Sequence, residues 1–299
     1  MTIYQEVQCR SACHKVMGHK SPSWFLNVYR GCEHRCRYCY AIYSHQYLQK
    51  YDPADYFQTI FVKSNIVELL EKQLRLPSWK REIISLNSVT DCYQPCEERY
   101  QFMPQILKLM IKYKNPIHIT TKSDLILRDF DLIDELARLT YVGVTVSVTT
   151  VDEKLQKELE PGAVSFARRL NVLKEFSKTE VIRGVHMMPL VPLITDTYQN
   201  LECLMHELSS VAPHYAAACL LRLCGQTRGY FLNYIGLHYQ HLLKPLTTLY
   251  QGQYPLKEYA DGVYQMLEKL MLEYGINRYE DFRKRFKFNQ ENYKQLSLL

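Results

Sequence analysis

The sequence alternates short apolar segments with amphipathic stretches, and this order restricts the possible folds more than any other feature. Six segments have the length and the β-branched composition of strands, at residues 24–29, 82–87, 116–121, 141–148, 181–188 and 216–223. Helical patterns lie between them, at about residues 66–76, 99–113, 125–139, 166–176 and 200–210. Such alternation predicts βαβ units on a parallel sheet. Six units predict an α/β fold, a partial (β/α)6 TIM-type barrel.

The chain after about residue 225 has a different character. Its sequence pattern indicates helices and is rich in tyrosine, and the basic run Arg283–Lys287 lies near its end. We therefore expect a core domain at residues 1–225, which includes a polar N-terminal arm. A helical C-terminal extension at residues 226–299 would pack on the open side of the barrel, where it could act as a lid.

Composition narrows the class of protein. Hydrophobic residues make up 47% of the chain and charged residues 23%, as in ordinary globular domains. No apolar run approaches the roughly 20 residues of a membrane span, and no secretory signal is visible at the N-terminus. We expect a cytoplasmic protein with no membrane partner. In that reducing compartment the ten cysteines are metal ligands, redox thiols or small core residues, not disulfides.

Three cysteines directly follow the first expected strand. Cys32, Cys36 and Cys39 have C-x3-C-x2-C spacing, with Tyr38 before the last. Random placement would produce this spacing in about one such chain in a hundred. Thiolates so spaced can hold three irons of a [4Fe-4S] cluster and leave the fourth iron open. The alternative is a structural zinc site, with His34 or another cysteine as the fourth ligand.

The segment at residues 26–41 resembles the radical S-adenosylmethionine (radical SAM) superfamily, in its branch that contains spore photoproduct lyase and DNA repair photolyase-like proteins. Further motifs of that branch follow in order over about residues 24–200. They are Thr90-Asp91 with Tyr93-Gln94-Pro95, Thr121-Lys122, Arg128-Asp129, Ser147, Glu160-Pro161 with Arg168-Arg169, and Met188-Pro189.

The resemblance implies the cofactors and the reaction. Cys32, Cys36 and Cys39 would bind a [4Fe-4S] cluster, whose open iron would bind S-adenosyl-L-methionine (SAM). The reduced cluster would cleave SAM to methionine and a 5′-deoxyadenosyl radical, which would abstract hydrogen from an unknown substrate. The protein would supply orientation and exclude water. Its partners would be SAM, a reductant such as flavodoxin or ferredoxin, and a substrate for which the branch suggests a nucleic-acid lesion or modified base, with a lyase reaction.

The resemblance also implies a SAM pocket. Its residues would be Tyr38 and Met188 at the adenine, Thr90 and Asp91 at the amino group, Lys122 and Arg169 on the carboxylate side, and Ser147 at the ribose. Each has a structural alternative. Lys122 could be a solvated lysine, Asp91 a turn cap, Ser147 a backbone partner, and Arg169 the partner of Glu160 or Glu175.

The remaining cysteines allow a second catalytic thiol. Cys92 and Cys96 lie in the loop after the second expected strand, on the side of the cluster loop. Cys92 is the candidate hydrogen donor to a substrate radical, and the alternative is an inert small residue. In the branch the donor cysteine would correspond to about Ser88, four residues earlier. Cys203, Cys219 and Cys224 are expected in helix or strand core.

Two other classes of function stay open beside the enzyme. One is an iron–sulfur electron carrier, which needs no SAM pocket and so leaves the Asp91, Lys122 and Ser147 matches unexplained. The other is a zinc-stabilised nucleic-acid-binding module. A nucleic-acid partner is favoured by the net charge of +6, the basic run and the 24 tyrosines, although a solvated basic helix end explains the run equally well.

Overall fold

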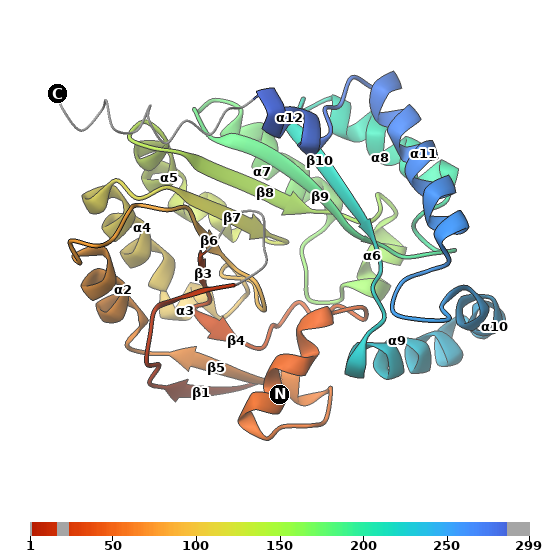
Figure 1. Ribbon diagram of the computed structural model, residues 1–299, viewed down its shortest axis with the longest axis horizontal. Helices are drawn as coiled ribbons and strands as arrows, with labels where there is room; N and C mark the ends of the chain where they lie inside the picture. Colours follow the sequence, from red (N-terminus) through yellow and green to blue (C-terminus); the bar gives the residue numbers. More distant parts are fainter. Residues whose placement is uncertain (1, 17–23, 286–299) are drawn as a thin grey trace.

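The computed structural model describes residues 2–16 and 24–285, and its centre is a twisted, open sheet of seven strands (Figure 1). The order is β10-β9-β8-β7-β6-β3-β2. The strands are β2 (Cys13–Lys15), β3 (Trp24–Leu26), β6 (Ile84–Leu86), β7 (Ile117–Thr121), β8 (Val142–Ser147), β9 (Ile182–Leu190) and β10 (Tyr215–Leu220). Neighbours from β3 to β10 pair in parallel, whereas β2 is antiparallel to β3. The predicted partial barrel is therefore confirmed, with one added antiparallel strand.

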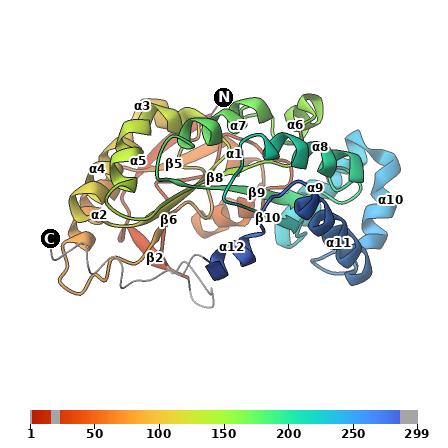
Figure 2. The same ribbon diagram turned by 90° about the horizontal axis from the view of Figure 1, so that it is seen from above.

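The helices between these strands cover one side of the sheet (Figure 2). They are α2 (Ile66–Leu74), α3 (Glu97–Tyr100), α4 (Phe102–Tyr113), η2 (Leu125–Asp129), α5 (Phe130–Ala137), α6 (Glu153–Leu159), α7 (Phe166–Phe176) and α8 (Tyr198–Ser209). Side-chain caps define three starts, because Asp152 accepts from the Leu155 N–H, Ser165 from the Arg168 N–H and Thr197 from the Asn200 N–H.

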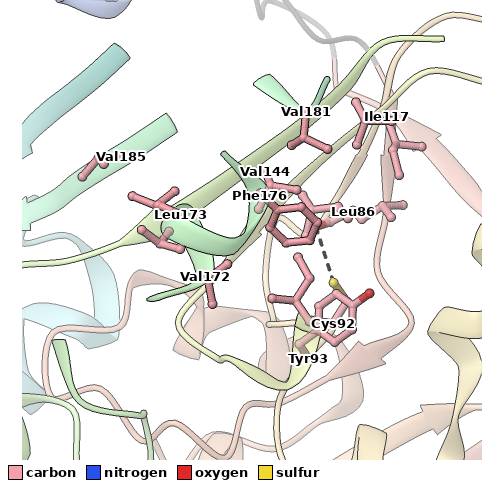
Figure 3. Packing of buried hydrophobic residues seen from close by; sticks show 14 of the residues in the cluster. Leu86, Cys92, Tyr93, Ile117, Val144, Val172, Leu173, Phe176, Val181 and Val185 are labelled. Atoms are coloured by element: carbon pink, nitrogen blue, oxygen red, sulfur yellow. Dashed lines mark hydrogen bonds between the residues drawn. The ribbon is translucent and has the colours of Figure 1, made fainter. Parts of the chain in front are cut away.

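The main hydrophobic core lies between the sheet and these helices (Figure 3). Val144 and Val185 of the strands are fully buried there against Phe176 of α7. Residues on the opposite face of the strands, such as Ser147 and His186, are polar and line the inside of the partial barrel. The period of two along each strand thus separates an apolar outer face from a polar inner face.

The N-terminal region corrects the sequence analysis. The polar arm contains β2 and one further strand, and the expected strand at residues 24–29 is divided in two. Strands β1 (Ile3–Val7), β5 (Thr59–Lys63) and β4 (Tyr29–Arg30) form a second sheet in the order β1-β5-β4. Between β4 and β5 lie η1 (Tyr40–Leu48) and α1 (Asp55–Gln58). The division occurs where the Asn27 side chain binds the loop after β6, so local sequence pattern gave no sign of it.

The C-terminal region is helical, as expected, and packs on the core beside β10 (Figure 1). Its helices are α9 (Gly225–His238), α10 (Gln240–Leu249), α11 (Lys257–Glu273) and α12 (Tyr279–Arg285). The Thr227 hydroxyl donates to the Cys39 carbonyl at 3.0 Å, so α9 touches the cysteine loop directly. Residues 286 and 287 of the basic run lie outside the described residues. Within the described part of the chain, no helix has the length and apolar character that crossing a membrane requires.

Candidate functional site

The three cysteines lie on the loop that joins β4 to η1. The loop begins at Gly31, whose φ of +92° is a conformation that favours glycine. A Cβ atom there would lie 2.7 Å from the Thr59 carbonyl oxygen, so any other residue would displace the loop. Cys32 and Cys36 are 9% and 8% exposed, and Cys39 is half-buried. The local backbone therefore holds all three thiols in a sheltered position.

The loop after β6 holds this cysteine loop in place. The Gln94 amide donates to the Gly31 carbonyl at 3.2 Å and accepts from the Glu33 N–H at 2.9 Å. The Thr90 hydroxyl also donates to the Gly31 carbonyl, at 2.6 Å. The Glu33 carboxylate in turn accepts from the Tyr4 hydroxyl of β1 at 2.7 Å. Thr90 is thus engaged with the loop backbone.

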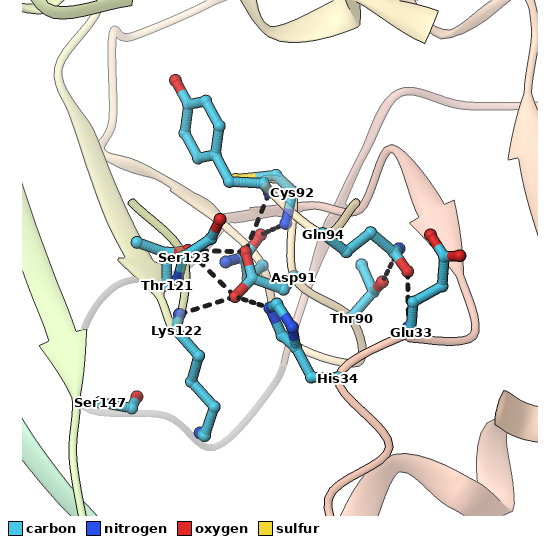
Figure 4. A network of polar contacts seen from close by, with 12 residues as sticks. Glu33, His34, Thr90, Asp91, Cys92, Gln94, Thr121, Lys122, Ser123 and Ser147 are labelled. Atoms are coloured by element: carbon cyan, nitrogen blue, oxygen red, sulfur yellow. Dashed lines mark hydrogen bonds and ion pairs between the residues drawn. The ribbon is translucent and has the colours of Figure 1, made fainter. Parts of the chain in front are cut away.

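Asp91 is the centre of a buried network at the ends of β6 and β7 (Figure 4). Its carboxylate lies 2.9 Å from His34 Nε2 and accepts from the Thr121 hydroxyl and from the N–H groups of Lys122 and Tyr93. Burial alone would raise the pKa of Asp91, but His34 and these hydrogen bonds hold it below its usual value. Asp91 thereby ties the cysteine loop to two strands, which makes it a positioning residue.

Glu160 is the centre of a second buried network and is fully inaccessible. It accepts from the Tyr38 hydroxyl and pairs with Arg169 at 2.5 Å, while Lys122 Nζ lies 4.0 Å away. Arg169 also donates to the Ser147 carbonyl at 2.8 Å. Arg169 is therefore the ion-pair partner of Glu160, which is one of the two partners considered for it as a structural alternative. Sequence reasoning did not select Glu160, although its position before Pro161 in a family-like motif was a usable signal.

Lys122, Ser147 and Met188 face the inner side of the partial barrel. The Lys122 side chain is 16% exposed, and its ammonium lies 6.0 Å from the centre of the Tyr38 ring. Ser147 follows Val146, which pairs with Thr121 in the sheet, so Ser147 and Lys122 are neighbours across β7 and β8 (Figure 4). The Ser147 hydroxyl has no hydrogen-bond partner among the described residues. Met188 lies near the carboxyl end of β9. The structure thus brings these three predicted residues to the edge of the sheet that carries the cysteine loop.

Cys92 occupies a different environment (Figure 3). Its side chain is 1% exposed and lies in the main hydrophobic core, with Sγ 3.9 Å from the Leu86 carbonyl oxygen. Burial and the nearby Asp91 charge raise the pKa of this thiol well above its usual value. Cys96 is also buried, at 3% exposure. This placement favours the inert alternative for Cys92 and gives no support to its prediction as hydrogen donor.

The donor set of the cysteine loop fits an iron–sulfur cluster. Burial raises the pKa of Cys32 well above its usual value, and negative charge on Asp91, Cys36 and Cys39 raises it further. Three adjacent thiolates therefore require a positive group, which cluster iron supplies. No three His, Cys, Asp or Glu side chains in the described ranges surround a point where one metal ion could bind. Each cysteine of a [4Fe-4S] cluster binds a different iron, so the three thiols need not converge on a single point.

Comparison with known proteins agrees with this geometry. Residues 26–201 match the family described as the Radical SAM superfamily. The chain belongs to the radical SAM superfamily. Its cofactors are accordingly a [4Fe-4S] cluster and SAM, and radical SAM catalysis is its class of activity. The electron-carrier and zinc-module alternatives gain no support from these findings.

The relatives in sequence are uncharacterised proteins. One from Mycobacterium tuberculosis (strain ATCC 25618 / H37Rv) is 32% identical over 276 residues, which cover 91% of this chain and 81% of the relative. Another, from Methanocaldococcus jannaschii, is 29% identical over 182 residues, which cover 61% of this radical SAM chain and 64% of the relative.

The solved structures with a similar fold include mutants of spore photoproduct lyase. One has a TM-score of 0.67 at 13% identity, over 91% of this chain and 79% of the other. A second, solved with bound AdoMet and dinucleoside spore photoproduct, has a TM-score of 0.66 at 13% identity and the same coverage. At this identity the similarity establishes the fold alone.

Proposed function

We propose that Cys32, Cys36 and Cys39 bind the [4Fe-4S] cluster, and that the inner-face residues beside them bind SAM. The cluster and SAM together supply a 5′-deoxyadenosyl radical, which removes hydrogen from the substrate. The observation that carries the proposal is the position of the cysteine loop. Tyr38 of this loop lies with its ring 6.0 Å from the Lys122 ammonium, and both side chains meet Glu160.

The chain's own residues would orient SAM. Lys122 would pair with its carboxylate, since a charge-assisted hydrogen bond is stronger than a neutral one. Ser147 would contact the ribose, and Tyr38 and Met188 would border the adenine. Arg169, paired with Glu160, would hold the carboxylate side of the pocket in shape. Thr90 and Asp91 would adjoin the amino group while holding the cysteine loop.

The substrate that we propose is a base within a nucleic acid, and the reaction a lyase-type cleavage. Four exposed tyrosines follow the cysteine loop directly: Tyr40 at 54%, Tyr43 at 40%, Tyr47 at 74% and Tyr51 at 64%. Arg30 lies 6.0 Å from the centre of the Tyr47 ring. Exposed aromatic rings beside a cation are the groups that stack on bases. The bound dinucleoside photoproduct in the similar lyase structure agrees with this choice.

We further propose a one-electron reductant such as flavodoxin or ferredoxin, and we retain the division into a core at residues 1–225 and an extension at residues 226–299 as a prediction. The cysteine loop contacts α9 through Thr227, and Tyr230 of α9 lies near Arg37. These contacts support a role for the described part of the extension in sheltering the site.

The first experiment is anaerobic. The protein is reconstituted with iron and sulfide, reduced with dithionite and mixed with SAM, and 5′-deoxyadenosine is measured by mass spectrometry. We expect its formation in the native protein and its loss in Cys36→Ala. Cys203→Ala removes an exposed thiol on α8 and serves as the matched control. A well-formed cluster without SAM cleavage would refute the proposal.

The substrate class is tested with short single-stranded oligonucleotides. We expect them to bind the native protein and to bind Tyr47→Ala more weakly, by about 1–3 kcal/mol for a lost stacking contact. Tyr47→Phe should retain binding because it keeps the ring. Equal binding by all three proteins would remove this surface from substrate recognition.

A further inference from the structure

The inner face of β10 carries a thiol to which the proposed SAM pocket assigns no role. Ser147 of β8 pairs in register with His186 of β9, and His186 pairs with Ala217 of β10. Residues paired in a parallel sheet point to the same side, so these three line the inside of the barrel. Cys219 lies two residues beyond Ala217, toward the carboxyl end where the site is.

The neighbours of Cys219 show that its side chain points inward. Ala218 and Leu220 pack into the hydrophobic core on the outer face, and Cys219 between them is exposed. Cys219 was expected in the core, and this expectation was wrong. The strand pairing shifts between Ala218 and Leu220, and this irregularity at the strand end leaves Cys219 accessible.

The thiol is also close to the site. Burial raises the pKa of Cys219 to about 11, against the opposing effect of the nearby Lys122 cation. Cys219 in turn contributes to the raised pKa of Tyr40, the first residue of η1. Cys219 is thus exposed at the strand end and lies within electrostatic range of Lys122 and Tyr40. At neutral pH it keeps its S–H bond.

Two other polar side chains on this inner face await a ligand. Ser147 is 5% exposed and its hydroxyl has no hydrogen-bond partner among the described residues. The His186 ring makes contacts with the rings of His118 and Tyr215, but its nitrogens have no hydrogen-bond partner in the described part of the chain. The Ser147 side chain is buried, whereas that of His186 is partly exposed. A buried side chain whose hydroxyl has no protein partner is uncommon, so Ser147 marks the lumen beside Cys219 as a binding space, the one that the proposed SAM pocket also uses.

We propose that Cys219 is the hydrogen-atom donor of this site, an inference that rests on the proposed function. Its S–H bond breaks homolytically, a C–H bond forms on a carbon radical in the lumen, and a thiyl radical remains on Sγ. The transfer is downhill because an S–H bond is weaker than an aliphatic C–H bond. One electron from the one-electron reductant that also serves the cluster, and one proton from water, then restore the thiol.

The test follows deuterium. In D2O the Cys219 thiol carries deuterium, so 5′-deoxyadenosine formed without substrate takes up solvent deuterium. We expect this label to be lost in Cys219→Ala and in Cys219→Ser, whose O–H bond is too strong to donate, and kept in Cys203→Ala. The label is measured per molecule of 5′-deoxyadenosine, so the yield does not affect it. Unchanged labelling in both Cys219 variants would overturn the proposal for Cys219 alone, whereas absence of 5′-deoxyadenosine from every protein would refute the proposed function.

A second measurement needs no turnover. N-ethylmaleimide labelling of the cluster-loaded protein is followed at each cysteine by mass spectrometry, at a mildly alkaline pH because the thiolate is the reactive form. We expect S-adenosylhomocysteine to slow labelling of Cys219 and to leave that of Cys203 unchanged. Labelling of Cys219 at the same rate with and without this probe would show that the thiol does not face the cofactor, and would overturn the assignment.

Discussion

Replacement of Glu160 by glutamine tests whether the buried network behind Lys122 stabilises the site. Glu160 is 0% exposed and Arg169 is 1% exposed, and their charged atoms are 2.5 Å apart. Glutamine keeps the size of the side chain but leaves the Arg169 guanidinium buried without a counter-charge. Removing one partner of a buried pair costs about 3–5 kcal/mol.

The expected change in melting temperature follows from this value. A domain of this size shifts by about 2 °C per kcal/mol, so Glu160→Gln should melt about 6–10 °C below the native protein. The matched control is Glu175→Gln, because Glu175 pairs with Lys178 at 2.6 Å on the surface, with side chains 35% and 64% exposed. An exposed pair contributes about 0–1 kcal/mol, so the control should shift by less than about 2 °C.

The assay is thermal unfolding of the cluster-free protein by circular dichroism, with Glu160→Gln, Arg169→Met and the double variant. The double variant should cost less than the sum of the two single variants, because it leaves neither charge of this pair without its partner. Equal shifts for Glu160→Gln and Glu175→Gln, or strict additivity with Arg169→Met, would refute the reasoning.

The same variant has a predictable pH dependence. Burial raises the pKa of Glu160, but the Arg169 and Lys122 charges and the hydrogen bonds from Tyr38 and Arg169 hold it below its usual value. A carboxyl group whose pKa is lowered by folding stabilises the folded state at pH values above its pKa in the unfolded chain, about 4.3. This contribution is lost as the pH falls through the pKa of the group in the folded protein. The difference between the native protein and Glu160→Gln should therefore be full at pH 7 and shrink below about pH 4.

Three further predictions concern the cysteine loop and Cys92. His34→Ala leaves the Asp91 carboxylate short of one partner, so we expect a loss of about 1–3 kcal/mol and less iron bound per chain by colorimetric assay. Gly162→Ala would place a Cβ atom 2.0 Å from the Glu33 carbonyl oxygen and should also lower iron content, whereas Gly252→Ala, with nothing within 4 Å, should not. Cys92→Ala should cost about 1 kcal/mol of stability and keep solvent deuterium in 5′-deoxyadenosine; loss of that label would restore Cys92 as a donor.

The partial barrel was predictable because its signals are local. Each parallel strand is a short apolar run and each helix an apolar stripe, and both periods can be read from neighbouring residues. The second sheet was not predictable in this way. Its strand β4 has two residues, and β1 pairs with β5 more than 50 residues away, as in the partners Ile3 and Thr59. Such pairing is decided by contacts between distant segments, for which local periodicity carries no information.

The candidate site divides along the same line. The cysteine spacing was visible because Cys32, Cys36 and Cys39 belong to one loop. The partners of the residues outside this loop were not visible in the sequence. The Glu160 network joins side chains from three segments, and Asp91 contacts His34, which is 57 residues away in the chain. The family motif predicted Asp91 near the SAM amino group but could not show that its carboxylate already accepts hydrogen bonds within the protein.

Cys92 and Cys219 show most clearly what the sequence alone could not determine. By itself, the sequence determined the fold class, the order of the βα units and the radical SAM motif, because these depend on spacing along the chain. It offered Cys92 as a candidate donor beside an inert alternative and expected Cys219 in the core, whereas tertiary structure buries Cys92 and exposes Cys219 to the inside of the barrel. Which face of a strand or loop meets the core depends on what packs against it, and only the folded chain decides that.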